Sequence, residues 1–246
     1  MSNNTCSRIN HLVSHFQHVK PTRKRNPNPS LQFSPYAKML ASPLRQCKYH
    51  RKMFPSALLL RFGLGRDDRI DKISASPEII SISNQGSKYY VHLRKKILQE
   101  LQPNGFRSVF RGSCQHFDKD MEHRVEHDLA ISAFQHLLSN HTVDIQHVKD
   151  REWQSNEPLQ CILVWRHPSS SLPFCELDHR VGDQLVPSYD VRQLWPDKIT
   201  SMIDANDTRD IVAVGVKRSS ATVKLAMALW RCNQYYQQPS SESILR

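Results

Sequence analysis

Residues 210–236 read DIVAVGVKRSSATVKLAMALWRCNQYY, and this stretch decides the fold class. Its first part, Asp210 to Val216, is apolar at both sets of alternating positions, which is typical of a strand buried on both faces. Ser219 or Ser220 can then cap a helix that runs to about Tyr236. The apolar face of this helix consists of Val223, Leu225, Met227, Leu229 and Trp230. A buried strand followed by an amphipathic helix indicates an α/β protein.

The same two patterns recur upstream. Residues 118–139 predict a long helix, because apolar side chains repeat at helical spacing from Met121 and acidic ones occupy the first turn. Residues 89–101 predict a second helix, with Tyr90 and Ile97 on its apolar face. Strands are expected at 56–64, 78–83, 159–165 and 185–189, and a short helix at 191–195. The prediction is α/β (mixed): one compact domain with a mixed sheet of at least four strands and three long helices.

The positive charge is confined to the beginning of the chain. The 246 residues contain 34 Lys and Arg against 23 Asp and Glu, a formal charge of +11. Twelve of the 34 precede Asp67, the first acidic residue, so the remaining 22 nearly balance the 23 acids. Such asymmetry is typical of a targeting segment or of a basic arm that binds nucleic acid.

The first 30 residues favour targeting. Between Arg8 and Lys20, apolar residues fall on one helical face and basic or His residues on the other, with no acid. This is the pattern of a mitochondrial transit peptide. We therefore expect a disordered basic targeting segment at 1–30, a single α/β domain at 31–238, a disordered tail at 239–246, and a mitochondrial matrix location.

Several other classes find no support in the sequence. Apolar runs are far shorter than the ~18 residues of a membrane span. The six cysteines form no CxxC pair, and Cys161 and Cys232 are predicted to be reduced core residues. No glycine-rich phosphate loop occurs among only 7 glycines. We expect no membrane span and no cofactor.

Two metal sites are possible on residue type alone. His123, Glu126 and His127 match the H-x-x-E-H pattern of some zinc peptidases, but they fall off the apolar stripe of their helix and are expected on its solvated face. The acids Glu176, Asp178, Asp190 and Asp210 could serve two-metal nucleic-acid cleavage only if they converged. We predict no metal site, which favours a non-catalytic protein and leaves an enzyme open.

A basic stretch with interspersed aromatic residues, 36–61, is the best candidate surface. Lys and Arg suit phosphate contacts, and Tyr49 or Phe54 could stack on bases. The alternative is import-related charge that continues into a structured edge. The candidate nucleic-acid or partner-binding residues are Lys38, Arg45, Lys48, Arg51, Lys52 and Arg61.

The same stretch carries a family motif. Residues 34–45, SPYAKMLASPLR, followed by RKMFPSALLLRF at 51–62, resemble a block in fungal mitochondrial proteins of the "required for respiratory growth" set, specifically its eighth-named member. The matching residues are Tyr36, Leu40, Ala41, Ser42, Pro43, Leu44 and Arg45. A looser similarity extends over 186–230. Pro43 should hold Ser42 outside the helical region, and Arg45 is expected to bind a carboxylate, a helix C-terminus or a phosphate.

The resemblance implies a mitochondrial protein needed for respiratory growth and mitochondrial genome maintenance, with no catalytic residues to transfer. Genome retention commonly depends on gene expression inside the organelle. The leading hypothesis is therefore a non-catalytic protein that binds RNA or a ribonucleoprotein in tRNA processing or translation. The alternatives are an organellar nuclease or metal-dependent hydrolase, and a scaffold that binds only proteins.

Overall fold

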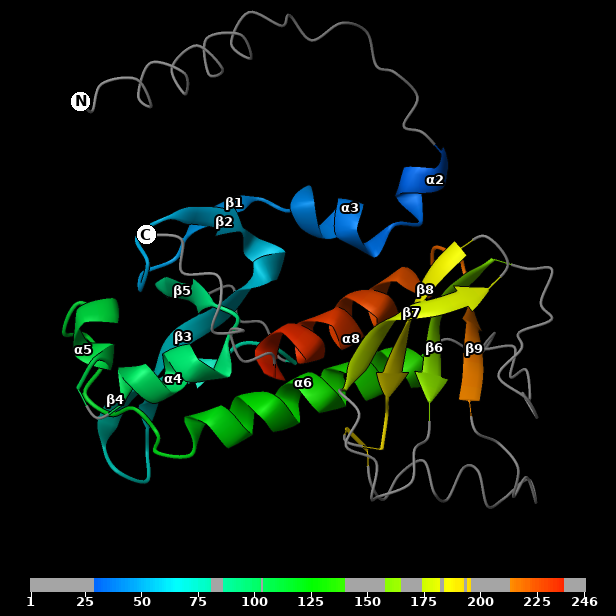
Figure 1. Cartoon of the computed structure of the whole chain (residues 1–246). Helices are drawn as coiled ribbons and strands as arrows, with labels where there is room; N and C mark the ends of the chain where they lie inside the picture. The colour runs from blue at the N-terminus through cyan, green and yellow to red at the C-terminus, as the bar shows by residue number, and fades with distance from the viewer. Residues whose placement is uncertain are drawn as a thin grey trace, which may run out of the picture.

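Two antiparallel helices form the centre of the molecule. The computed structural model describes residues 29–80, 86–102, 104–139, 158–164, 174–181, 184–192, 194–195 and 213–236. Helices α6 (Met121–Leu138) and α8 (Val223–Tyr236) lie side by side, with one sheet toward each end of the pair (Figure 1). The Tyr235 hydroxyl donates to the carbonyl of Glu122 over 2.8 Å, which joins the last turn of α8 to the first turn of α6.

The sheet at one end of this pair has four strands, in the order β7 (Cys175–Val181), β8 (Gln184–Asp190), β6 (Leu159–Val164) and β9 (Ala213–Lys217). Strands β6 and β8 are parallel, whereas β6–β9 and β7–β8 are antiparallel. Every residue of β6 is buried, as expected for an apolar strand between two neighbours. The mixed sheet of at least four strands is confirmed.

The other sheet has three antiparallel strands in the order β4 (Lys72–Pro77), β3 (Leu59–Asp67) and β5 (Lys88–His92). Helices α4 (Lys95–Leu101) and α5 (Phe106–Val109) follow β5. An aromatic cluster of Phe62, Tyr89, Phe110 and Phe117 packs between this sheet and the segment after α5. Its residues belong to one continuous core that also includes the facing sides of α6 and α8.

Residues 29–55, which we call the arm, precede both sheets. The arm contains α2 (Pro29–Gln32), α3 (Pro35–Leu40) and a hairpin of β1 (Leu44–Gln46) and β2 (Met53–Pro55). Helix α3 starts where the sequence specifies a start, because the Ser34 Oγ accepts from the Ala37 N–H and Pro35 occupies the first helical position. Figure 1 shows the arm lying across α8, against which α3 packs.

The helix predicted at 89–101 is wrong in its first part. Residues 88–92 form β5, and the helix α4 starts only at Lys95. Tyr89, Tyr90 and Val91 have strong strand preference, and β5 pairs with β3 along its whole length. Tertiary pairing therefore overrides a spacing that also fits a helix.

Three other predicted elements differ from the structure. The described part of 78–83 is not a strand, because the ladder ends at Pro77 and Glu78 turns inward to form ion pairs. At 56–64, a 3₁₀ turn, η1 (Ser56–Leu58), precedes β3, which continues through two glycines to Asp67. The described residues of 191–195 form a turn rather than a helix, and the Asp190 carboxylate accepts from the Arg192 N–H at its start.

The long elements are confirmed. Helices α6 and α8 and strands β6, β8 and β9 lie within two or three residues of their predicted bounds. Ser219 and Thr222 exchange hydrogen bonds in the turn before α8. Cys161 and Cys232 are fully buried free thiols, and burial raises the pKa of each to about 12. Three predictions lie outside the described residues: the targeting helix before Lys20, the disordered tail at 239–246, and the first residue of the predicted strand, Asp210.

Candidate nucleic-acid interface

Five of the six predicted basic residues gather on the arm. None of these five side chains forms an ion pair with a carboxylate within the described part of the chain. Lys48 Nζ donates to the Gln46 side chain over 3.1 Å, which leaves its charge unneutralised. The five residues are Lys38, Arg45, Lys48, Arg51 and Lys52. The arm is therefore a local source of positive potential.

Arg61, the sixth residue, belongs to the interior rather than to this surface. Its Nε lies 2.6 Å from the Glu78 Oε2 atom, and the Glu78 Oε1 atom lies 2.5 Å from Lys88 Nζ. The Glu78 side chain is only 7% exposed. The charge that the sequence assigns to a binding surface is thus used here to balance a buried carboxylate between β3 and β5.

The hairpin loop between β1 and β2 is held in a fixed conformation. The backbone of the buried Cys47 bonds to Arg51 and Lys52, and the Lys48 N–H donates to the Tyr90 carbonyl of β5 over 2.7 Å. Arg51 has φ +57°, a left-handed conformation that is uncommon for a residue other than glycine. Outliers of this kind cluster at functional sites.

The loop is also tied to α4. The Tyr49 hydroxyl donates to the Glu100 carboxylate, and this bond raises the pKa of Tyr49, with a smaller effect from burial. Tyr49 as a whole residue remains 39% exposed, and its ring makes a T-shaped contact with the His50 ring. The loop therefore presents Lys48, Arg51 and Lys52 from a rigid base.

The family motif has a clear structural role at Ser42. Its Oγ donates to the Met39 carbonyl over 2.6 Å and accepts from the Ala57 N–H over 3.0 Å. The Pro43 carbonyl accepts from the Ser56 N–H over 2.9 Å. These bonds join the end of α3 to η1, so the Ala41–Ser42–Pro43 turn fixes the arm on the body of the protein.

Arg45, by contrast, has no side-chain partner among the residues that the structure describes. It lies opposite Phe54 in the β1–β2 ladder, is exposed, and contacts no carboxylate or helix end among the described residues. Its guanidinium is therefore accessible from outside on the surface of the hairpin.

The arm also exposes large apolar side chains, which the sequence did not indicate. Leu40, Leu44 and Met53 are 65%, 56% and 57% exposed. Tyr36 is partly covered, and burial raises its pKa, with smaller contributions from Cys175 and Cys161 of the four-stranded sheet. Apolar side chains beside unpaired cations are typical of a surface that contacts a macromolecule.

An imidazole cluster underlies the hairpin. The His92 ring on β5 lies 5.3 Å from the Phe54 ring and 5.7 Å from the His50 ring. Burial, with smaller contributions from the positive charges of Arg94 and His50, lowers the pKa of His92 to about 4. His50 has a lowered pKa for the same main reason, burial.

This cluster predicts acid sensitivity. The folded protein should keep His92 neutral down to about pH 4, whereas the unfolded chain protonates it near pH 6.5. Stability should therefore fall as the pH drops from about 6.5 to 4, and His92→Gln should reduce that dependence. NMR titration of the His92 ring provides the direct measurement. A midpoint near 6.5 in the folded protein would contradict the packing described above.

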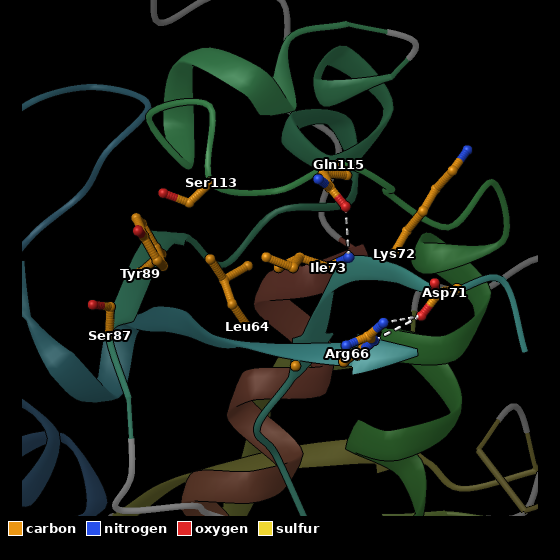
Figure 2. Close-up of a pocket in the computed structure, with 10 residues that line it drawn as sticks. Leu64, Arg66, Asp71, Lys72, Ile73, Ser87, Tyr89, Ser113 and Gln115 are labelled. Atoms are coloured by element: carbon orange, nitrogen blue, oxygen red, sulfur yellow. Dashed lines mark hydrogen bonds and ion pairs between the residues drawn. The ribbon is translucent and has the colours of Figure 1, made fainter. Parts of the chain in front are cut away.

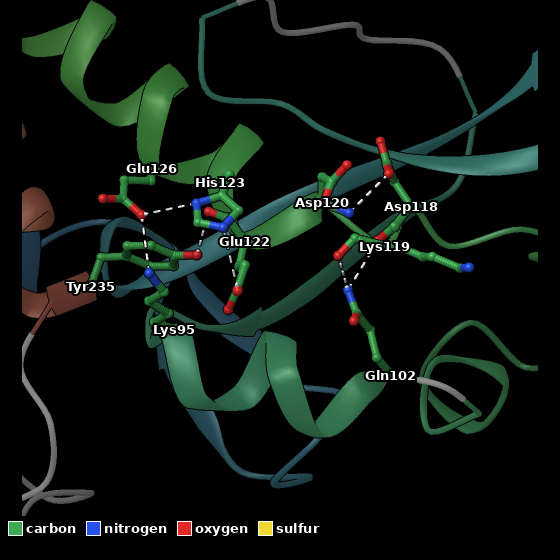
Figure 3. A network of polar contacts seen from close by, with 9 residues as sticks. All are labelled: Lys95, Gln102, Asp118, Lys119, Asp120, Glu122, His123, Glu126 and Tyr235. Atoms are coloured by element: carbon green, nitrogen blue, oxygen red, sulfur yellow. Dashed lines mark hydrogen bonds and ion pairs between the residues drawn. The ribbon is translucent and has the colours of Figure 1, made fainter.

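The H-x-x-E-H residues lie on the solvated face of α6, as expected. His123 and His127 are 67% and 73% exposed, and each approaches a neighbouring carboxylate of the same helix. Figure 3 shows Glu126 between His123 and Lys95 of α4, whose Nζ lies 3.2 Å away. This network links α4 and α6. A second link comes from the Gln102 side-chain amide, which donates to the carbonyls of Asp118 and Lys119 just before α6.

The four acids considered for metal-assisted cleavage are not shown to converge. Asp190 is buried beside Arg192, with 3.7 Å between Oδ2 and Nη2. Glu176 and Asp178 lie on β7, but their side chains are not described, and Asp210 is outside the described residues. In the described part of the chain, no three His, Cys, Asp or Glu side chains are grouped to hold a metal.

An open depression of about 640 Å³ lies beside the β3–β4 hairpin (Figure 2). Arg66 and Asp71 form an ion pair at its edge, and the Gln115 side chain accepts from the Ile73 N–H over 3.0 Å. Lys72 extends away from that pair (Figure 2). Because its charges largely compensate each other, this depression is a weaker candidate than the arm.

These features define a mixed α/β protein that carries a basic arm with exposed apolar residues. The family model for "required for respiratory growth protein 8, mitochondrial" matches residues 11–159, more than half of the chain, so the chain belongs to that family. It is accordingly a mitochondrial protein of respiratory growth. The match includes the arm, the three-stranded sheet and α6, but not residues 186–230, where a looser similarity was expected.

No curated protein and no solved structure gives a significant match to the chain. No helix in the described ranges has the length and apolar character needed to cross a membrane.

Proposed function

We propose that this protein binds RNA, alone or within a ribonucleoprotein, in the mitochondrial matrix. The observation that carries the proposal is the set of five cations on the arm, none of which forms an ion pair with a carboxylate of the described residues. Through this interaction the protein would support tRNA processing or translation, and thereby maintenance of the mitochondrial genome. The basic segment 1–30 would direct import, and the arm would begin the mature domain of 31–238.

The arrangement of side chains on the arm favours binding of single-stranded or looped RNA. Lys and Arg at several points of a rigid hairpin can contact successive phosphates, and the partly exposed Tyr49 can stack on a base. The chemistry requires no catalytic group, because binding of this kind depends on positive potential and stacking alone.

The test is the double variant Arg45→Ala/Arg51→Ala. On single-stranded RNA each phosphate contact contributes about 0.7 to the slope of log K against log salt. The loss of two contacts should lower this slope by about 1.4 and weaken binding about 25-fold at 0.1 M salt. Fluorescence anisotropy with labelled single-stranded RNA and with a mitochondrial tRNA precursor measures both quantities.

The matched control removes the same charge elsewhere. Arg107 on α5 and Lys119 before α6 are exposed and form no ion pair within the described ranges. The Arg107→Ala/Lys119→Ala variant should therefore bind RNA nearly as the wild type does. If the two double variants lose equal affinity, binding reflects overall charge and the arm is not the site.

A protein-binding scaffold is the second candidate, because Leu40, Leu44 and Met53 are exposed together on the arm. Leu40→Ser/Met53→Ser leaves the cations in place and removes apolar contact area. If this variant loses its mitochondrial partners while RNA crosslinking in isolated organelles is absent even for the wild type, the scaffold replaces the RNA-binding proposal.

A further inference from the structure

A small cavity lies between α6 and α8, away from the arm's charged hairpin. Its volume is about 120 Å³, and its walls come from two facing rows of side chains. The row on α6 consists of Leu129, Ser132 and His136. The row on α8 consists of Lys224, Met227, Ala228 and Arg231. Both rows have the three- or four-residue spacing of one helical face, so the antiparallel pairing of the helices brings them together.

The cavity is polar and cationic on one side. Lys224 and Arg231 carry positive charge, His136 and Ser132 offer further polar atoms, and none of the described residues that line it is Asp or Glu. Leu129, Met227 and Ala228 provide apolar walls, which strengthen electrostatic interactions inside.

Arg231 is the unusual group. Its guanidinium has five N–H donors, but Nη2 donates to the Leu59 carbonyl over 3.3 Å and Nε is inaccessible to solvent with no hydrogen-bond partner in the described residues. Burial lowers its pKa, and the nearby Cys232 opposes that effect. Arg231 is only partly exposed and forms no ion pair with a carboxylate of the described residues, so an anionic partner is favourable, because a poorly hydrated charge without compensation is unfavourable.

We propose that this cavity binds a small oxyanion of the phosphate type. About 10–15 Å³ suffices for one water, so the cavity has room for a tetrahedral anion, whereas drug-sized ligands need about 300 Å³ or more. Arg231 binds the anion from the inside, Lys224 from the solvent side, and Ser132 donates its hydroxyl. The bound anion neutralises the residue that anchors α8 to the first residue of β3.

Calorimetry and thermal unfolding of the full chain with inorganic phosphate, at constant ionic strength, test this site. One phosphate should bind per chain, and Tm should rise by about 5 °C or more when phosphate reaches one hundred times its Kd. Lys224 is exposed, so Lys224→Ala should fold normally and bind about 10-fold more weakly, by loss of one charge-assisted bond. Lys119→Ala, which removes an exposed lysine outside the cavity, should bind as the wild type does.

Two further measurements complete the experiment. Arg231→Met should abolish binding if it folds, and Lys224→Ala decides the matter if it does not. The same measurement with glycerol phosphate decides whether the site accepts a phosphate ester or only the free ion. Equal binding of the two probes indicates that the site takes a phosphate group carried by a larger molecule. The proposal is overturned if phosphate raises Tm no more than sodium chloride does, or if Lys224→Ala binds phosphate with unchanged Kd.

Discussion

Replacement of Phe110 by alanine should lower the free energy of unfolding by about 3–5 kcal/mol. The side chain is completely buried, and its ring centre lies 5.0 Å from that of Tyr89 and 5.9 Å from that of Phe62. Truncation leaves a cavity between the three-stranded sheet and the segment after α5, and it removes the favourable geometry of the aromatic pairs. Urea unfolding followed by circular dichroism measures the loss.

Two variants make this result interpretable. Because small domains have only about 5–15 kcal/mol of stability in total, the alanine variant can be substantially unfolded. Phe110→Leu keeps most of the apolar volume and should lose clearly less. Tyr49→Ala, at an exposed aromatic residue, should cost about 1 kcal/mol or less. Equal losses at residues 110 and 49 would show that the aromatic cluster is not the centre of this core.

The fold class could be predicted because the longest elements carry their own signals. Strand β6 is apolar except for Gln160, and α6 repeats apolar residues from Met121 to Ala133 at helical spacing. These patterns hold whatever the neighbours are. In β5, by contrast, Tyr90 and Leu93 fit a helical face equally well, and only the pairing of Tyr90 with Arg61 of β3 decides in favour of a strand. A contact across about thirty residues is not encoded in local spacing.

The short elements of the arm were missed for a related reason. Strands β1 and β2 have three residues each, too few for alternation to appear. Their stability comes from outside, through the bonds of Ser42 to Ala57 and of Lys48 to Tyr90. The motif residues could be identified from the sequence, but the partners that give them a role lie elsewhere in the chain.

The candidate surface shows the same limit. The sequence reveals that cations outnumber acids before Asp67, but it does not tell which cation meets an acid later in the chain. Arg61 finds Glu78 because β3 and the end of β4 are adjacent, whereas Arg45 and Arg51 form no ion pair with a carboxylate of the described residues. The fold therefore divides one uniform charge run into an internal ion pair and an external surface.

Replacement of Glu78 by alanine tests that division and should lower the free energy of unfolding by about 3 kcal/mol. The carboxylate lies between Arg61 and Lys88, whose side chains are only 25% and 14% exposed, so its removal leaves two poorly hydrated cations close together. The loss falls at the lower end of the range for buried ion pairs because Arg61 retains contact with solvent. Asp71→Ala is the matched control: it breaks the Arg66–Asp71 pair, which is 69% and 73% exposed, and should cost less than about 1 kcal/mol.

Variants at Arg61 and Glu78 also distinguish a charge that stabilises the fold from a charge that binds RNA. Since Arg61 acts inside the body, the apolar double replacement Arg61→Met/Glu78→Met should largely restore stability relative to Glu78→Ala, as it removes both a buried carboxylate and one of its cations. It should also leave RNA affinity and its salt dependence unchanged, unlike Arg45→Ala/Arg51→Ala. Urea unfolding and anisotropy on the same preparations give both readings. If the double Met variant shows a smaller salt dependence of RNA binding than the wild type, Arg61 contacts RNA after all. If Glu78→Ala and Asp71→Ala lower the free energy of unfolding equally, the ion pairs of Glu78 with Arg61 and Lys88 contribute no more than a surface pair.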